Sequence, residues 1–340
     1  MAMLAKIIAV APRVAPRKLL EPEQIARFKT RFRAWWEGYK FTPSEVDADP
    51  SEESDAAEDE TKIALPDPLA ISKRKASLWA DPQVVVQEYL WGTGFDTPGG
   101  RRLVLEMVAP LGLNSKMTLL EIGSGLGGAA CAIAAQTGSW VTGLDISPDV
   151  VDAATELSTM AGMAKKTPMQ LFDPKKPNFS AFGSFNAAFS KERFFRYPNK
   201  EKIFAALHGA LRESGQLVMT DFLLASEDNP GDAVEKWLGA EPERPEPWTA
   251  AKTQSCLEKL GFEVPIVKDI TDEYVSLLRE TIETYCKGLN PEQMDKPMAE
   301  AVVNEIDLWD WRLKAFASGG LAVYRIYARK FQGVSAKGSD

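Results

Sequence analysis

The sequence of 340 residues has very few of the side chains that form disulfide bonds or bind metals. It contains three cysteines, Cys131, Cys256 and Cys286, and a single histidine, His208. Three widely separated cysteines give neither a disulfide framework nor the spacing of a zinc site, and they are typical of a reducing compartment. We therefore predict a cytoplasmic protein without a bound metal.

The sequence also lacks any apolar run of the roughly 18 to 20 residues that are needed to cross a bilayer. Its formal net charge of −8 at pH 7 argues against nucleic acid as the main partner. Hydrophobic residues make up 45% of the chain, which is ample for a packed core. These features predict a soluble protein that acts on something other than nucleic acid.

The N-terminal part of the sequence has an uneven distribution of charge. Residues 1–40 contain nine Lys or Arg and three Glu, whereas residues 45–60 contain nine Asp or Glu and no base. Apolar and aromatic residues recur at helical spacing between the bases of residues 25–39, which predicts a basic amphipathic helix. We interpret residues 1–44 as an N-terminal helical arm and residues 45–74 as an acidic flexible linker.

Three surfaces could bind this arm. A basic helix can dock on its own folded domain, contact a partner protein, or lie on an anionic membrane, because each offers negative charge. Docking on protein is the preferred interpretation, and peripheral membrane contact is the alternative. The sequence does not predict the oligomeric state.

The most informative segment is residues 118–128, where an apolar run breaks into four glycines before an Ala-rich helical segment. Glycine adopts positive φ and lets a ligand approach the main chain, while the amides of the following helix face the loop. Residues 140–145 then read as a buried strand that ends in Asp145. A carboxylate one βαβ turn beyond such a loop can accept both hydroxyls of a ribose. The pattern predicts a nucleotide-like ligand.

Two classes of enzyme share this arrangement. Dinucleotide-dependent enzymes hold a pyrophosphate on the loop, whereas methyltransferases that use S-adenosylmethionine (SAM) hold the methionyl half of the cofactor there. Glu121 favours SAM, because a carboxylate repels a pyrophosphate and attracts an ammonium group. A structural glycine turn in some other α/β protein is the remaining alternative.

Helical and strand patterns alternate from residue 75 onward, which predicts a parallel sheet. Seven strands are expected, and the last two form a reversed pair. They cover residues 118–122, 140–145, 169–172, 185–190, 216–222, 262–269 and 321–330. The predicted fold is α/β, a Rossmann-like seven-stranded sheet with helices on both faces, in a domain of residues 75–334. Helical insertions are expected around residues 225–250 and 270–315.

Three motifs resemble those of a known family. Residues 89–100 (YLWGTGFDTPGG) match an aromatic, glycine-rich loop, and residues 120–128 match a glycine loop. Residues 189–192 (FSKE) match an S-R-D segment, and residues 215–222 match a strand that ends in T-D-Y. All three are similar to the phosphoethanolamine N-methyltransferases, within the class I SAM-dependent methyltransferases. The resemblance covers about residues 77–330 and implies that class of enzyme.

The resemblance also implies which residues bind SAM. Those placed around the methionyl group are Glu121, Gly123, Ser124, Gly125, Ser190 and Lys191. Asp145 would bind the ribose, Ile146 would pack on adenine, and Asp173 would accept a hydrogen bond from the adenine amino group. Both aspartates can alternatively cap the turns that follow them.

The substrate side departs from the family. Its enzymes place a Tyr–His pair near the amine, and the aligned positions here are Trp79 and Arg196. Phe222 replaces the tyrosine of T-D-Y, and it is predicted with Phe95 to line the acceptor site. Because the hydroxyl and the imidazole are missing, phosphoethanolamine itself is not the expected acceptor.

The predicted catalytic residues are Glu192, Arg196 and Trp79. Glu192 keeps an acid where the family has Asp, and it is the group expected to orient or deprotonate an amine. Arg196 and Arg312 are predicted to bind an anionic group of the acceptor, because guanidinium forks suit phosphate or carboxylate. Ion pairing at the surface is the alternative for both.

These observations predict an enzyme that transfers a methyl group from SAM to a small-molecule or lipid-headgroup acceptor, leaving S-adenosylhomocysteine. N-methylation is favoured over O- or C-methylation. The alternative is a SAM-binding protein of this fold that serves assembly or regulation without robust catalysis. The missing Tyr–His pair favours that alternative, whereas the intact Glu121, Gly123, Gly125 and Asp145 oppose it.

Overall fold

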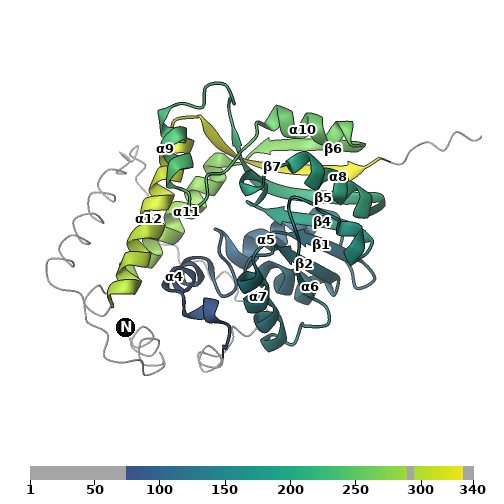
Figure 1. The fold of residues 1–340 in the computed structure, drawn as a ribbon, viewed down its shortest axis with the longest axis horizontal. Helices are drawn as coiled ribbons and strands as arrows, with labels where there is room; N and C mark the ends of the chain where they lie inside the picture. Colours follow the sequence, from purple (N-terminus) through teal and green to yellow (C-terminus); the bar gives the residue numbers. More distant parts are fainter. Residues whose placement is uncertain (1–73, 289–294, 332–340) are drawn as a thin grey trace, which may run out of the picture. The chain divides into compact units, whose positions relative to one another are not determined.

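The computed structural model describes residues 74–288 and 295–331 (Figure 1). The chain divides into two units, and the sheet belongs to the unit that comprises residues 74–289 and 304–340. The predicted arm and all but the last residue of the predicted linker lie outside the described residues. Within the described part of the chain, no helix is long and apolar enough to cross a membrane.

A seven-stranded sheet forms the centre of this unit, in the order β3-β2-β1-β4-β5-β7-β6. Its strands are β1 (Thr118–Ile122), β2 (Trp140–Asp145), β3 (Met169–Leu171), β4 (Phe185–Lys191), β5 (Leu211–Leu224), β6 (Phe262–Asp269) and β7 (Leu321–Lys330). Strands β1 to β5 run parallel, and β7 is antiparallel to both β5 and β6. The predicted Rossmann-like sheet and its reversed last pair are confirmed.

Strand β5 is longer than the sequence pattern predicts. It begins at Leu211 rather than at residue 216, because Leu211 pairs with Phe185 before the register shifts. At the other end it reaches Leu224, which pairs with Leu321 of β7. Backbone pairing with both neighbours therefore extends the strand beyond its apolar core.

Helices flank the sheet and extend beyond the carboxyl ends of its strands (Figure 1). The α-helices are α4 (Pro82–Trp91), α5 (Gly100–Val108), α6 (Gly128–Thr137), α7 (Pro148–Met160), α8 (Lys200–Ala210), α9 (Asp232–Ala240), α10 (Ala250–Lys259), α11 (Thr271–Gly288) and α12 (Lys296–Ala317). Short 3₁₀ turns are η1 (Ser77–Ala80), η2 (Ala109–Leu111), η3 (Phe179–Phe182) and η4 (Phe194–Arg196).

The two faces of the sheet bury separate cores, because alternate side chains of a strand point to opposite faces. Leu119 and Ala187 pack in one core with residues of α5 and α6. Leu120 and Ala188, the next residues along each strand, pack in the other core with residues of α8 and α10. The predicted helices on both faces are thereby confirmed.

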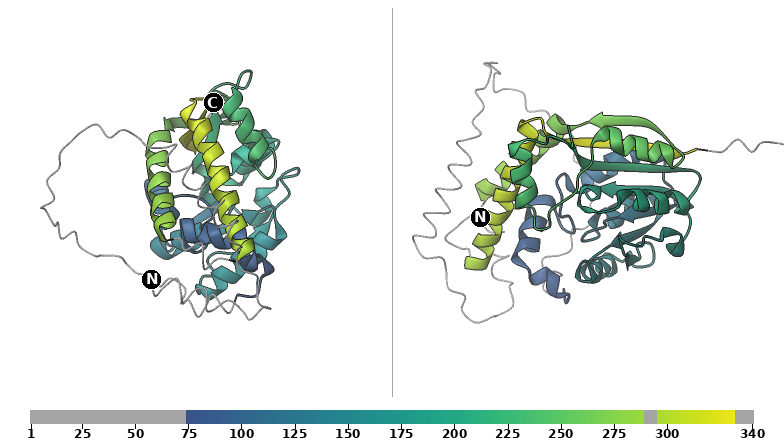
Figure 2. Two further views of the ribbon diagram at one scale, coloured as in Figure 1. Left: turned by 90° about the vertical axis from the view of Figure 1, so that its left-hand side faces the viewer. Right: turned by 45° about the horizontal axis from the view of Figure 1, so that its top comes forward.

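The regions of the predicted insertions contain α9, α11 and α12. In Figures 1 and 2, α9, α11 and the part of α12 from Asn304 onward lie beyond the carboxyl ends of β4 and β5. Loops at the carboxyl ends of parallel strands form the usual ligand-binding edge of such sheets. These helices therefore stand over the edge where the predicted site residues gather.

Candidate active site

The glycine loop begins where β1 ends, at Ile122. Gly123, Gly125 and Gly127 adopt φ values of 74°, 52° and 86°, which favour glycine. The amides of Gly123 and Ser124 donate to the carbonyl of Leu144, at 2.8 and 2.9 Å, and so fix the loop against β2. The loop presents bare backbone at the edge of the sheet, immediately before α6.

Asp145 is the last residue of β2 and lies beside this loop. The residue is 8% exposed. Oδ2 accepts a hydrogen bond from the amide of Gly125 at 3.1 Å, and Oδ1 accepts from the amides of Ile146 and Ser147 at 2.8 and 3.1 Å. Three backbone donors hold the carboxylate in place, and its remaining lone pairs can accept the hydroxyls of a ribose. The turn-capping and ribose-binding interpretations are therefore compatible.

The predicted adenine residues lie next to Asp145 at the strand ends. Ile146 is 41% exposed, an unusual exposure for a large apolar side chain and one that a flat base can cover. Asp173 is exposed, and its Oδ1 accepts a hydrogen bond from the amide of Lys175 at 2.8 Å. Asp173 thus forms the predicted alternative, a turn contact, and its adenine contact stays a prediction.

Glu121 and Ser124 are buried polar residues whose bonding is incomplete. Within the described part of the chain, Oε2 of Glu121 and Oγ of Ser124 have no hydrogen-bond partner. Burial raises the pKa of Glu121 to about 8, although the positive charge of Arg193 opposes the shift. A buried acidic side chain with one unpartnered oxygen suits the ammonium of a bound amino-acid group, so these residues fit SAM.

The raised pKa of Glu121 predicts a specific pH dependence of stability. The folded protein holds this proton up to about pH 8, whereas the ordinary pKa is 4.5, so the folded state binds more protons between these values. The free energy of unfolding contributed by Glu121 should therefore fall as pH rises through this window. We expect Glu121→Gln to flatten that fall, measured by urea denaturation of the cofactor-free protein at pH 5 to 8 (roughly the window set by the shift). Parallel curves for the two proteins would contradict the shift.

Ser190 and Lys191 end β4 and hold neighbouring segments together. The hydroxyl of Ser190 donates to the carbonyl of Ile122 at 2.8 Å. The buried ammonium of Lys191 donates to the carbonyl of Pro98, to the hydroxyl of Thr97 and to Oε2 of Glu192, at 2.7, 2.8 and 3.0 Å. All three donors of Lys191 are used inside the protein, so this residue fixes the loop before α5 against β4.

Glu192 follows at the end of β4 and is 2% exposed. Besides its ion pair with Lys191, its Oε1 accepts a hydrogen bond from the hydroxyl of Thr220 at 3.2 Å. Its φ of 52° lies in the left-handed region, which is strained for a residue with a side chain. Burial raises the pKa of Tyr274 well above its ordinary value, and the adjacent charge of Glu192 raises it further. Glu192 is therefore a firmly positioned carboxylate.

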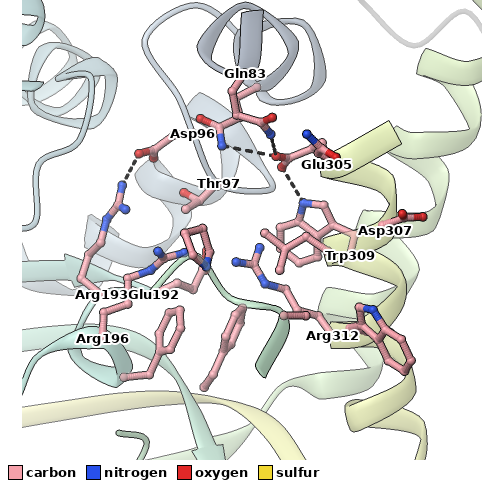
Figure 3. Close-up of a pocket in the computed structure, with 18 residues that line it drawn as sticks. Gln83, Asp96, Thr97, Glu192, Arg193, Arg196, Glu305, Asp307, Trp309 and Arg312 are labelled. Atoms are coloured by element: carbon pink, nitrogen blue, oxygen red, sulfur yellow. Dashed lines mark hydrogen bonds and ion pairs between the residues drawn. The ribbon is translucent and has the colours of Figure 1, made fainter. Parts of the chain in front are cut away.

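A cavity of about 580 Å³ opens beside Glu192 (Figure 3). Its walls come from α4, the loop before α5, the end of β4, Phe222 of β5 and the face of α12 from Asn304 to Arg312. The cavity brings together four predicted site residues, which are Glu192, Arg196, Phe222 and Arg312.

Two other predicted residues do not line this cavity. Trp79 is buried against Leu126 and Leu157, and its Nε1 donates to Glu156 at 3.1 Å. Phe95 packs against the core that contains α5 and α6. A catalytic role for Trp79 and a substrate contact for Phe95 stay predictions, and the geometry of this cavity does not support them.

Two of the three arginines that line the cavity share one carboxylate. Arg312 forms a bidentate pair with Glu241, from Nε at 2.7 Å and Nη2 at 2.9 Å, and Arg196 lies 3.4 Å from the same carboxylate. Burial favours the neutral form of Glu241, but the charge and hydrogen bonds of Arg312 lower its pKa. This group of three side chains carries one more positive than negative charge, and Arg196, whose side chain is 37% exposed, is its more exposed cation. Four acids, Asp96, Glu192, Glu305 and Asp307, also line the cavity.

Several charged residues of the site were not predicted, among them Asp96, Arg193 and Glu305. Asp96 and Arg193 form an ion pair at the mouth of the glycine loop, and Glu305 accepts hydrogen bonds from Gln83, Gln87 and Trp309 (Figure 3). Asp96 lies within the aromatic loop motif and Arg193 directly after FSKE. A charge within the first motif and one next to the second could have indicated these two residues.

Residues 120–219 match the family model described as a methyltransferase domain. This part of the chain has the class I methyltransferase fold. This domain is similar to the phosphoethanolamine N-methyltransferase of Plasmodium falciparum (isolate 3D7), with 24% identity over 239 residues, 69% of this chain and 87% of the relative. The predicted family resemblance and the assignment to SAM-dependent methyltransferases are confirmed.

Solved structures show the same fold for the methyltransferase domain. Phosphoethanolamine N-methyltransferase 2 of Haemonchus contortus, in complex with SAM, has a TM-score of 0.66 at 19% identity and covers 75% of this chain. The same enzyme with phosphomonomethylethanolamine and S-adenosylhomocysteine has a TM-score of 0.60 at 19% identity, over 75% of this chain. The chain spans 58% and 59% of the length of these two structures. Both contain the predicted cofactor or its product.

Proposed function

We propose that this protein transfers the methyl group of SAM to the amine of a small molecule that also carries an anionic group. The supporting observation is that Glu192, at the end of β4, lines the same cavity as the cations Arg196 and Arg312. A carboxylate suits the amine, and an excess of guanidinium charge suits the anion.

The residues of the strand ends would hold the cofactor. SAM supplies an already activated methyl group, so the protein needs only to align a nucleophile and exclude water. Asp145 would bind the ribose, Ile146 would cover the adenine, and the glycine loop with Glu121 would hold the amino-acid end. This arrangement directs the methyl group toward Glu192, because β1 and β4 are neighbours in the sheet.

The acceptor residues would act on the amine and on its substituent. An amine must be neutral to attack, and Glu192 would orient it and accept its proton. Phe222 and Trp309 border the cavity, and Arg312 lies over both rings, 5.8 and 4.3 Å from their centroids, so their aromatic character already suits a cation there. Arg196 would bind the anion, since Arg312 already forms two hydrogen bonds with Glu241, from Nε and from Nη2.

The relatives suggest a phosphorylated ethanolamine as the class of acceptor. These relatives are phosphoethanolamine N-methyltransferases, and one solved relative contains phosphomonomethylethanolamine. In this chain Trp79 and Arg196 align with the Tyr–His pair of those enzymes, so we propose that Glu192 takes over the handling of the proton. The partly methylated phosphobase, which needs less orientation by hydrogen bonds, is the first acceptor to test.

A transfer assay with labelled SAM tests this proposal. We expect methylation of phosphomonomethylethanolamine, and none of ethanolamine, because Arg196 requires an anion. Arg196→Ala should raise the KM for the acceptor by about tenfold, as expected for one lost charged hydrogen bond, with unchanged affinity for S-adenosylhomocysteine. Binding of S-adenosylhomocysteine without transfer to any amine would contradict the proposal.

A second candidate function is a SAM-binding assembly or regulatory factor. The observation that favours it is that the side chain of Arg193 lies on the glycine loop, where a cofactor would bind. The same transfer assay separates the two functions, because only the enzyme consumes SAM.

We also propose, from charge alone, that residues 1–40 direct this protein to an acidic protein surface or to an anionic membrane in the cytoplasm. Nine bases against three acids support such contact. The division into arm, linker and methyltransferase domain of residues 75–334 belongs to the same proposal.

A further inference from the structure

Arg193 covers the surface of the glycine loop. A β-carbon built on Gly123 would overlap Cγ of Arg193, and one built on Gly125 would lie 2.6 Å from its Nη2 and 2.7 Å from Oδ2 of Asp96. The aliphatic part of Arg193 therefore runs along Gly123, and its guanidinium reaches Gly125. Gly123 and Gly125 have no side chains, so a ligand could approach the backbone there if Arg193 did not fill the space.

Two interactions hold Arg193 in this place. Its Nε donates to the carbonyl of Gly123 at 3.2 Å, and its Nη2 forms an ion pair with Asp96. The two side chains are 16% and 22% exposed, so the pair is only weakly screened by solvent. Burial favours neutral Asp96, yet the charge and hydrogen bond of Arg193 lower its pKa.

Arg193 is also the cation that faces three carboxylates of the cofactor site. The charges of Asp96 and Asp145 both raise its pKa against the effect of burial, and its own charge opposes the raised pKa of Glu121. The amino-acid end of SAM carries an ammonium and a carboxylate, next to the sulfonium. Its ammonium has the same charge as the guanidinium of Arg193 and competes with it for the acidic side chains of the cofactor site.

We propose that the Asp96–Arg193 pair closes the methionyl half of the cofactor site, and that the amino-acid end of SAM displaces Arg193 and places its ammonium beside Asp96. This inference rests on the proposed use of SAM. Arg193 also lines the acceptor cavity, so a displaced guanidinium has room on that side. Asp96 is then a specificity residue for ligands with an amino-acid group.

The adenosine half of the site is not covered by this pair. Ile146 is 41% exposed, and the carboxylate of Asp145 is bonded to amides of the loop and of its own turn. A ligand that has the adenosine but no amino-acid group should therefore bind without displacing Arg193. Methylthioadenosine is such a ligand, and S-adenosylhomocysteine is its full-length counterpart.

Calorimetric titration of the full chain with these two ligands tests the inference. If the closed form makes up about 90% of the free protein, Arg193→Ala should tighten binding of S-adenosylhomocysteine about tenfold. Its affinity for methylthioadenosine should stay within about twofold of that of the unchanged protein. In the Arg193→Ala background, Asp96→Asn should weaken S-adenosylhomocysteine about tenfold, because the ammonium loses its carboxylate.

Arg102→Ala is the matched control, since Arg102 is an exposed arginine of α5 that pairs with Glu106 in its own helix. It should change neither affinity. If Arg193→Ala does not fold, Arg193→Gln keeps most of the stem, loses the ion pair and gives the same test. Weaker binding of S-adenosylhomocysteine to either Arg193 variant, or equal changes for both ligands, would overturn the inference. Failure of the unchanged protein to bind either ligand would instead refute the proposed function.

Discussion

Replacing Asp145 with alanine is expected to weaken binding of S-adenosylhomocysteine by about 2 to 3 kcal/mol, or roughly 30- to 150-fold. The carboxylate is held by the amides of Gly125, Ile146 and Ser147, so it is already oriented when a ribose arrives. The substitution removes a charged acceptor from the ribose and also loosens the glycine loop. Both effects weaken the binding of S-adenosylhomocysteine.

Calorimetry with S-adenosylhomocysteine and with NAD measures this effect. Asp149→Ala is the control, because Asp149 is an exposed acid in the first turn of α7, four residues beyond Asp145. It should leave the affinity nearly unchanged. An affinity that does not depend on Asp145, or measurable binding of NAD, would refute the assignment of the cofactor site.

Replacing Glu192 with glutamine is expected to lower kcat by a factor of about 10² to 10⁴, the range for loss of a general base. The carboxylate lines the cavity and is fixed by Lys191 and by the hydroxyl of Thr220. Glutamine keeps the shape and size of the side chain and can still form hydrogen bonds, but it cannot accept the proton of the amine. The affinity for S-adenosylhomocysteine should change little.

Steady-state methylation of phosphomonomethylethanolamine gives kcat, and calorimetry shows that the variant still folds and binds the cofactor product. Glu106→Gln, on the exposed face of α5, provides a control for the loss of one negative charge. Full activity of Glu192→Gln would mean that a group other than Glu192 accepts the proton of the amine. A parallel loss of cofactor affinity would make Glu192 part of the cofactor site rather than of the acceptor site.

The sheet could be predicted closely because its signals are local. The bounds of β1, β2, β6 and β7 agree with the sequence pattern, since a buried strand is marked by a short apolar run between turn residues. The ends of β5 were missed. They depend on pairing with β4 and β7, and a pairing partner leaves no signature in the strand itself.

The sequence marks the candidate cofactor residues more clearly than the candidate acceptor residues. Glu121, the glycines and Asp145 lie within one short βαβ segment, whose backbone requirements restrict the residues that fit. The acceptor half combines segments that are distant in sequence. Glu241 and Arg312 are 71 positions apart, and Trp79 turns away to bond Glu156 although its position in the alignment suggests a catalytic residue.

The sequence by itself determined the class of fold, the glycine loop and the acid that follows it, because chain geometry and hydrophobic periodicity are properties of short windows. Only the tertiary structure decided which charges meet. It paired Arg193 with Asp96, 97 positions away, across the glycine loop, and gave Arg196 and Arg312 a common carboxylate. Ion pairs depend on distance in space and on burial, and neither quantity can be obtained from the spacing of residues along the chain.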